Sequence, residues 1–249
     1  MKRVLFILVI ALSSLTIVAQ DRGGLVIKGY RVLMDTTYDK PVEPRASAII
    51  SKYRPKMERA MMEVVGKSDV EMRSGKPESL LSNFAADAML SYSSKFGGAD
   101  LAITNFGGLR AAMPAGDVRR YDIFSIFPFE NYLVIVEIPG HQVRELFGFF
   151  AKNGPQAISG NVKYAIKDRK LEGEPLINGK PISDERSYKV ATLDFLLTGG
   201  DDLTMLKENL GVVTTGVLLR DIIFDRIENM MKRDGKIHSD LDGRVTLIK

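Results

Sequence analysis

Apolar positions recur along the chain with two periods, which predict interleaved helices and strands. Segments with an apolar residue every three or four positions are predicted to be helices, at 46–65, 78–94, 141–151 and 219–230. We expect Pro55 to kink the first of these helices or to divide it in two. The segment 121–127 is predicted to form one short helix or turn.

Strands are predicted where short apolar runs are bounded by glycine, proline or asparagine. The run at 132–138 is apolar on both faces, so we expect it inside a sheet. The other predicted strands are 25–33, 70–73, 100–104, 162–166, 171–176, 188–193 and 243–248. Asn178-Gly179 predicts a hairpin turn between strands 171–176 and 188–193. The fold class is therefore α/β or α+β, with a layered mixed β-sheet and helices in one compact domain.

The first 19 residues are typical of an export signal. Lys2 and Arg3 precede an uncharged, mostly apolar segment that ends at Ala19. About 16 such residues are fewer than the roughly 20 that a membrane-spanning helix needs, so we expect a cleaved signal peptide, with an uncleaved anchor as the alternative. We therefore expect an exported protein, periplasmic or extracellular, with no stable membrane span after cleavage. Its predicted parts are a signal peptide at 1–19, an N-terminal arm at 20–45 and a folded domain at 46–249.

Composition excludes several classes of function. The 249-residue chain has no cysteine, which excludes disulfide bonds, thiol catalysis and thiolate metal ligands. Its formal net charge is +4, but basic residues are scattered among acidic ones, so no nucleic-acid-binding surface is predicted.

Candidate chemistry gathers in three segments that combine glycine or proline turns with phenylalanine and one polar side chain. These segments are 103–110, 127–131 and 195–201. Glycine lets the backbone approach a ligand, and an arginine offers a planar fork suited to phosphate or carboxylate. Two phenylalanines on separate loops are suited to hold a flat base between them. The three segments together predict a nucleotide or nucleoside pocket.

Five segments, in order and spacing, carry a resemblance to a known family. They are Glu78–Leu90, Ala99–Arg110, Phe127–Asn131, Tyr188–Phe195 and Gly199–Leu206. Over roughly residues 60 to 248, the chain resembles the C-terminal, substrate-binding domain of the 5′-nucleotidase family, which also includes UDP-sugar hydrolases. The resemblance implies a layered α/β fold and a role in nucleotide catabolism.

The resemblance also implies the roles of particular residues. Phe129 and Phe195 match the two phenylalanines that sandwich the base, and Arg110 matches an arginine on the phosphate side. Asn105 matches a base-contacting asparagine, and Asp201 matches the aspartate that binds the ribose hydroxyls. The predicted substrate-binding set is Asn105, Gly107, Gly108, Arg110, Phe129, Phe195, Gly200 and Asp201.

Three positions depart from the family pattern. Phe106, Glu130 and Asp202 stand where the family usually has glycine, and the two added carboxylates favour recognition of a nucleoside or base over a phosphate.

Each matched residue also has a structural alternative. The two phenylalanines are alternatively core residues, Arg110 is alternatively a partner of Glu130 in an ion pair, and Asn105 is alternatively a turn former. Asp201 is alternatively a helix cap.

The catalytic half of the family is a separate metallophosphatase domain, whose two metals need about six or seven ligands. This chain has two histidines, His141 and His238, and neither lies in a metal-binding motif. We therefore expect no catalytic residue, no metal site and no cofactor in this chain. The leading hypothesis is an exported substrate-binding subunit that works with a separately encoded metallophosphatase carrying the divalent metals. The alternatives are a non-catalytic nucleoside-binding or nucleotide-binding protein, and a structural interaction module with both phenylalanines in its core.

Overall fold

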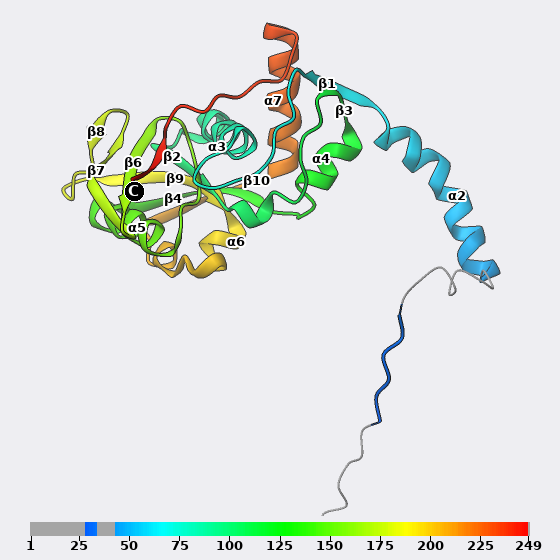
Figure 1. The fold of residues 1–249 in the computed structure, drawn as a ribbon, viewed down its shortest axis with the longest axis horizontal. Coiled ribbons are helices and arrows are strands. Elements are labelled where there is room, and N and C mark those ends of the chain that lie inside the picture. Colours follow the sequence, from blue (N-terminus) through cyan, green and yellow to red (C-terminus); the bar gives the residue numbers. More distant parts are fainter. Residues whose placement is uncertain (1–27, 34–42, 249) are drawn as a thin grey trace, which may run out of the picture. The chain divides into compact units, whose positions relative to one another are not determined.

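The computed structural model describes residues 28–33 and 43–248 of the chain (Figure 1). Residue contacts divide the chain into two units, Met1–Ser51 and Lys52–Lys249. The predicted signal peptide lies outside the described residues. The predicted strand 25–33 is wrong over its described part, 28–33, which is exposed and has no strand partner. Among the helices of the described ranges, none is both long enough and apolar enough to cross a bilayer.

Helices and strands alternate along the chain. The α-helices are α2 (Pro44–Met61), α3 (Leu80–Ser93), α4 (Arg120–Ile126), α5 (Gly140–Asn153), α6 (Asp194–Leu197) and α7 (Leu219–Asp234). The short 3₁₀ helices are η2 (Ser94–Phe96), η3 (Phe106–Gly108), η4 (Gly200–Asp202) and η5 (Thr204–Lys207). The strands are β1 (Val64–Ser68), β2 (Leu101–Thr104), β3 (Gly116–Arg119), β4 (Tyr132–Pro139), β5 (Ala157–Ile158), β6 (Val162–Lys167), β7 (Lys170–Ile177), β8 (Lys180–Pro181), β9 (Ser187–Leu193), β10 (Gly211–Leu218) and β11 (Val245–Ile248).

The strands of the second unit form three sheets. The largest has the order β10-β4-β9-β2-β5, in which β2 and β9 are parallel and the other neighbours are antiparallel. A four-stranded sheet has the order β11-β6-β7-β8, and β1 pairs with β3. Figure 1 shows α3 and α5 on opposite sides of the largest sheet, which explains why β4 is buried on both faces. The predicted mixed α/β fold is confirmed.

Helix α3 illustrates how local sequence sets an element. Ser79 and Ser82 form a reciprocal capping box, in which the Ser79 hydroxyl accepts from the Ser82 amide at 3.2 Å. The buried face of the helix includes Leu81, Phe84 and Ala88, as its apolar period predicts. This face packs against β2, β5 and β9 of the largest sheet.

Two expectations for the segment 46–73 need correction. Helix α2 runs on through Pro55, so the helix is not divided in two there, and it carries no buried residue. Because that helix is exposed, water can satisfy the carbonyl group that Pro55 leaves without a donor. The expected strand 70–73 makes one isolated bridge, between Met72 and Met113, and the strand here is β1.

A third correction concerns the turns. Asn178-Gly179 forms a turn with positive φ at both residues, but it joins β7 to the short strand β8 and not to β9. The β6–β7 hairpin turns at Asp168 and Arg169, whose φ angles of 49° and 60° lie in the left-handed region. Neither residue is glycine, and only Asp168 is a common turn former, so the sequence carried a weak signal for this turn.

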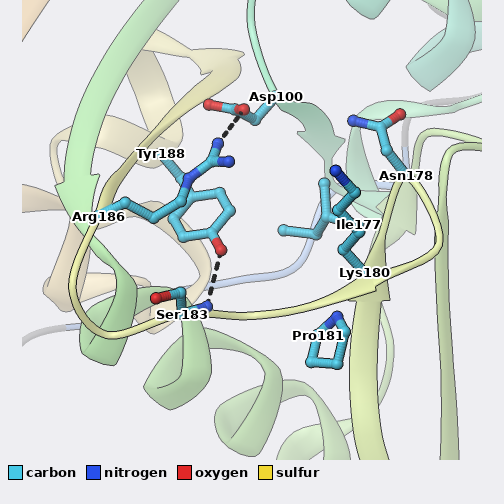
Figure 2. Close-up of a pocket in the computed structure, with 8 residues that line it drawn as sticks. All are labelled: Asp100, Ile177, Asn178, Lys180, Pro181, Ser183, Arg186 and Tyr188. Atoms are coloured by element: carbon cyan, nitrogen blue, oxygen red, sulfur yellow. Dashed lines mark hydrogen bonds and ion pairs between the residues drawn. The ribbon is translucent and has the colours of Figure 1, made fainter.

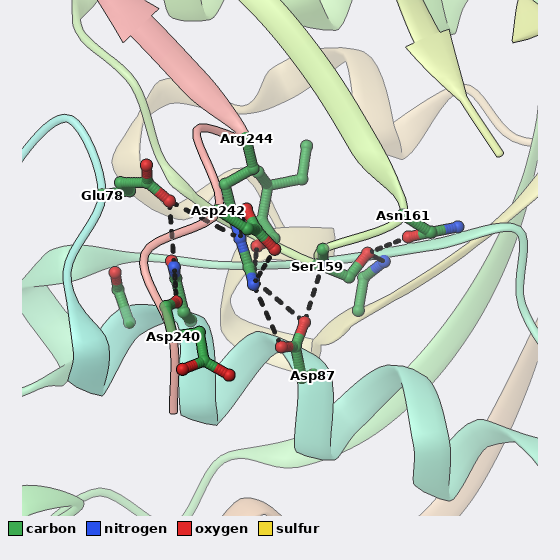
Figure 3. A network of polar contacts seen from close by, with 12 residues as sticks. Glu78, Asp87, Ser159, Asn161, Asp240, Asp242 and Arg244 are labelled. Atoms are coloured by element: carbon green, nitrogen blue, oxygen red, sulfur yellow. Dashed lines mark hydrogen bonds and ion pairs between the residues drawn. The ribbon is translucent and has the colours of Figure 1, made fainter. Parts of the chain in front are cut away.

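A buried arginine joins the C-terminal segment to α3. Arg244 is 2% exposed, and its guanidinium lies 2.9 Å from Asp87 and 2.9 Å from Asp242 (Figure 3). It also donates to the carbonyl of Ile158 at 2.8 Å, and Glu78 lies 3.8 Å away. Burial would raise the pKa of the Asp242 carboxyl, but hydrogen bonds from Arg244 and Lys163 outweigh burial and hold that pKa below its ordinary value.

The strand at one edge of the largest sheet remains apolar and exposed. β10 pairs with β4 only, and Val212 and Val213 are both exposed. The regular register between the two strands runs from Gly211 to Thr214 and is then interrupted before Leu218. Gly216, with φ of 68°, lies in this interruption.

We expect Arg244→Met to lower the free energy of unfolding by about 1–3 kcal/mol, because it removes the hydrogen bonds that the buried guanidinium donates to Asp87, Asp242 and the Ile158 carbonyl. Urea denaturation measures this loss. Arg73→Met is the matched control: its side chain is 75% exposed and pairs with Glu71, so a change of about 0–1 kcal/mol is expected. Equal effects of the two substitutions would show that the Arg244 cluster does not anchor the fold.

Candidate functional site

The direction of three neighbouring strands brings the predicted segments to one edge of the sheet. β2 and β9 are parallel, so their C-terminal ends lie at the same edge. β4 runs antiparallel to β9, and Leu133 near its start pairs with Leu193 at the end of β9. The loops that follow β2, precede β4 and follow β9 therefore meet. Such edges are common ligand-binding positions in α/β proteins.

These loops enclose a cavity of about 280 Å³. It is lined by Asn105, Gly107, Gly108, Arg110, Phe129, Asn131, Phe195 and Asp201. Seven of these eight are residues of the predicted substrate-binding set. The remaining predicted residue, Gly200, does not line the cavity but lies against Phe195.

The polar wall of the cavity is a pair formed by Asn105 and Asp201. The Asn105 amide nitrogen donates to Asp201 Oδ2 at 2.7 Å, while Asn105 Oδ1 is buried and has no hydrogen-bond partner among the described residues. Gly108 makes room for this side chain, because a Cβ there would lie 2.9 Å from Asn105 Oδ1. Asp201 has φ of 51°, in the left-handed region, so its backbone conformation is strained.

The apolar walls are the two phenylalanines. Phe129 is 49% exposed and Phe195 is 43% exposed, so neither is a core residue. A Cβ at Gly200 would lie 2.5 Å from Cζ of the Phe195 ring and 2.6 Å from its carbonyl oxygen. Gly200 therefore supports the ring position of Phe195 from outside the cavity.

Asp194 links the loops that carry the two rings. One carboxylate oxygen of Asp194 accepts from the amide of Phe195 at 2.8 Å and from the amide of Tyr132 at 3.1 Å. Tyr132 follows Asn131, the lining residue that the predicted set omitted. Asn131 lies within Phe127–Asn131, one of the segments that carry the family resemblance, so the sequence did point to its neighbourhood. Asp194 had no such signal, because its second partner is 62 residues away in the chain.

Arg110 is exposed and has no carboxylate within 4 Å in the described part of the chain. Its Nη1 donates to the Gly107 carbonyl at 3.3 Å. Glu130 lies instead 4.0 Å from Arg220, so the alternative of an Arg110–Glu130 ion pair is wrong. The three residues that depart from the family pattern, Phe106, Glu130 and Asp202, do not line the cavity.

Histidine and carboxylate side chains do not gather into a metal site. Across residues 28–33 and 43–248, no group of three or more potential ligands could hold a metal ion. His141 is exposed, and His238 contacts Asp234 at 2.9 Å. These described residues offer binding groups without a metal centre.

A second cavity, of about 260 Å³, contains none of the predicted residues (Figure 2). Three of its polar residues bond to each other or to the backbone: Arg186 pairs with Asp100 and covers the ring of Tyr188 at 4.2 Å, and the Tyr188 hydroxyl accepts from the Ser183 amide at 2.8 Å. These contacts connect the segment around β8 to β9.

A family model described as "5′-nucleotidase, C-terminal domain" matches residues 64–208. The chain belongs to this family. It is 27% identical over 249 residues to the trifunctional nucleotide phosphoesterase YfkN of Bacillus subtilis, covering 92% of this chain and 17% of that protein. It is 30% identical over 145 residues to UshA of Escherichia coli, covering 57% of this chain and 26% of UshA.

Solved structures show the same fold. The 5′-nucleotidase precursor from Thermus thermophilus matches with a TM-score of 0.72 and 22% identity, over 82% of this chain and 43% of that one. The NAD nucleotidase of Haemophilus influenzae matches with a TM-score of 0.61 and 20% identity, over 82% and 41%. The chain thus spans less than half of each of these four relatives.

We expect Gly200→Ala to lower the free energy of unfolding by about 1–3 kcal/mol, because the added methyl group collides with Phe195. Urea denaturation measures the loss, and a crystal structure of the variant is expected to show a displaced Phe195 ring. Gly211→Ala is the control, since a Cβ there meets nothing within 4 Å. An unchanged Phe195 position and stability in Gly200→Ala would contradict the supporting role of Gly200.

Proposed function

We propose that the chain is the nucleotide-binding or nucleoside-binding domain of an exported 5′-nucleotidase-type phosphohydrolase, acting in nucleotide catabolism. One observation carries the proposal: Phe129 and Phe195, from separate loops, line one cavity together with Asn105, Arg110 and Asp201. Membership of the 5′-nucleotidase C-terminal domain family supports it.

In the proposed complex the base lies between the rings of Phe129 and Phe195. Stacking on an aromatic ring contributes about 1–3 kcal/mol per base and tolerates different bases. Aromatic rings that are nearly half exposed leave apolar surface in water, which a base would cover. The cavity lies close to the lower end of the roughly 300–1,000 Å³ typical of small-molecule sites, so the base and ribose fill it.

The polar groups of the cavity match the rest of a nucleoside. Asn105 lines the cavity with its side chain held by Asp201, and it would meet the base. Asn105 occupies Oδ2 of Asp201, which leaves Oδ1 to accept from a ribose hydroxyl. Arg110 stands at the cavity wall with no carboxylate partner among the described residues, and it would meet a phosphate group.

The hydrolytic chemistry is proposed to come from a metallophosphatase on a separate chain. The described residues contain no candidate metal centre, and a dinuclear site would supply both the nucleophilic water and charge stabilisation. The exposed methionines Met57 and Met62 support a partner surface, because flexible thioether side chains suit protein contacts.

Calorimetric titration with adenosine, AMP and UMP tests the binding site. We expect Phe129→Ala and Phe195→Ala each to weaken binding roughly 5- to 150-fold, the equivalent of about 1–3 kcal/mol of lost stacking. Tyr121→Ala is the control, since Tyr121 is 59% exposed and lies outside the cavity. Undiminished binding in both phenylalanine variants, or no binding by the natural chain, would refute the base clamp.

Release of phosphate from AMP tests the need for a metal-bearing partner. The purified chain is expected to release no phosphate above the uncatalysed rate in the presence of Mg²⁺, Mn²⁺ or Zn²⁺, because residues 28–33 and 43–248 contribute no dinuclear centre. A colorimetric phosphate assay measures the rate, and a complete 5′-nucleotidase serves as the positive control. Metal-dependent turnover by this chain alone would rule out the separate partner.

A further inference from the structure

The loop that carries Phe129 is held from one side by a single buried arginine. Arg220 is 8% exposed, and its Nη1 donates to the carbonyl oxygens of Phe127 and Pro128, both at 3.2 Å. These carbonyls belong to the two residues that immediately precede Phe129. The same guanidinium lies over the ring of Phe124 at 4.4 Å.

The other side of the loop is hydrogen-bonded to Leu219, which precedes Arg220 in helix α7. The amide of Leu219 donates to the carbonyl of Asn131 at 2.9 Å. Leu219 and Arg220 are the first two residues of α7. The backbone on both sides of Phe129 is therefore bonded to the first turn of one helix, and Phe129 is the exposed tip between the two attachments.

The position of Arg220 is costly for the helix itself. A cation in the first turn of a helix faces the positive end of the helix dipole, and its burial removes water from a charged group. Glu130 offsets little of this cost, because it is 78% exposed and its carboxylate lies 4.0 Å away. The two loop carbonyls and the Phe124 ring are the contacts that compensate for the burial. These contacts indicate that Arg220 serves to hold the loop at residues 127–131.

We propose that Arg220 is the positioning residue of the nucleoside site, holding Phe129 at the separation from Phe195 at which a base fits between the rings. The inference rests on the proposed function of the cavity. Arg220 lies outside residues 64–208, which the family model matches, and it does not line the cavity. It acts on the ligand only through the backbone of residues 127–129.

The test compares Arg220→Gln and Arg220→Lys with Arg233→Gln, a control on the exposed end of the same helix. Adenosine is the probe. Calorimetry measures affinity, and proton NMR at saturating ligand measures the upfield ring-current shift of the adenine protons between the two phenylalanines. Hydrogen exchange of the ligand-free proteins reports whether residues 127–131 stay ordered.

We expect Arg220→Gln to weaken adenosine binding on the order of tenfold, since it removes charge-assisted hydrogen bonds that order the loop. We also expect a smaller ring-current shift at saturation and faster exchange at residues 129–131. Arg220→Lys keeps the charge but loses the planar guanidinium that lies over Phe124, and its binding and ring-current shift are expected to fall between those of the natural protein and Arg220→Gln. Arg233→Gln is expected to match the natural protein in all three measurements.

The outcomes separate the two proposals. If the natural chain binds adenosine and shifts its protons, and Arg220→Gln shows equal affinity and an equal shift, the role of Arg220 is overturned. The proposed function then still stands. A natural chain that neither binds nor shifts adenosine overturns both. A folded Arg220→Lys variant with weaker binding and a reduced shift supports the inference even where Arg220→Gln fails to fold.

Discussion

The buried guanidinium of Arg244 connects the two larger sheets through its hydrogen bonds. Arg244 immediately precedes β11 of the four-stranded sheet, and it donates to the carbonyl of Ile158 in β5 of the five-stranded sheet. Asp87 brings α3 into the same cluster (Figure 3). Because β5 pairs with β2, the strand that leads into Asn105, this connection supports one side of the cavity. A buried cation requires several partners, and here they come from segments far apart in the sequence.

The cavity itself follows from strand direction. Parallel pairing of β2 with β9 and antiparallel pairing of β4 with β9 place three chain segments at one edge, and each brings one part of the proposed ligand site. The sheet thus supplies a rigid base, while the loops supply the side chains. Hydrogen bonds between loops, such as those from the amides of Phe195 and Tyr132 to Asp194, restrict how far the rings of Phe129 and Phe195 can move apart.

Elements with a strong apolar period were predictable from the sequence. Helices α3, α5 and α7 and strand β4 bury the faces that their periods indicate. β10 was missed because its residues are exposed on both faces and show no apolar alternation. The turn at Asp168-Arg169 was not predicted because Asp168 is the only common turn former there and arginine rarely adopts a left-handed backbone.

The lining of the cavity could be predicted where the family resemblance points to particular residues. The contacts that hold those residues in place could not be predicted, because they join distant parts of the chain. Seven of the eight cavity-lining residues fall in the predicted set. Whether these residues bind a nucleoside stays a prediction. Arg220 was not found because its partners, the carbonyls of Phe127 and Pro128, lie more than 90 residues away, and backbone acceptors carry no sequence signal. Glu130 and Asp202 lie outside the lining, which only the loop conformations could show.

The interrupted register of β10 bears on how this protein behaves at high concentration. An unpaired edge strand with exposed valines is a template on which another chain can extend the sheet, and such growth leads to aggregates. In β10 the regular register stops after Thr214, and Gly216, with a left-handed φ, lies in the interruption before pairing resumes at Leu218. Only the first half of the strand therefore offers a straight edge, and the break limits how many rungs an incoming strand could form. The irregularity thus serves solubility as well as shape.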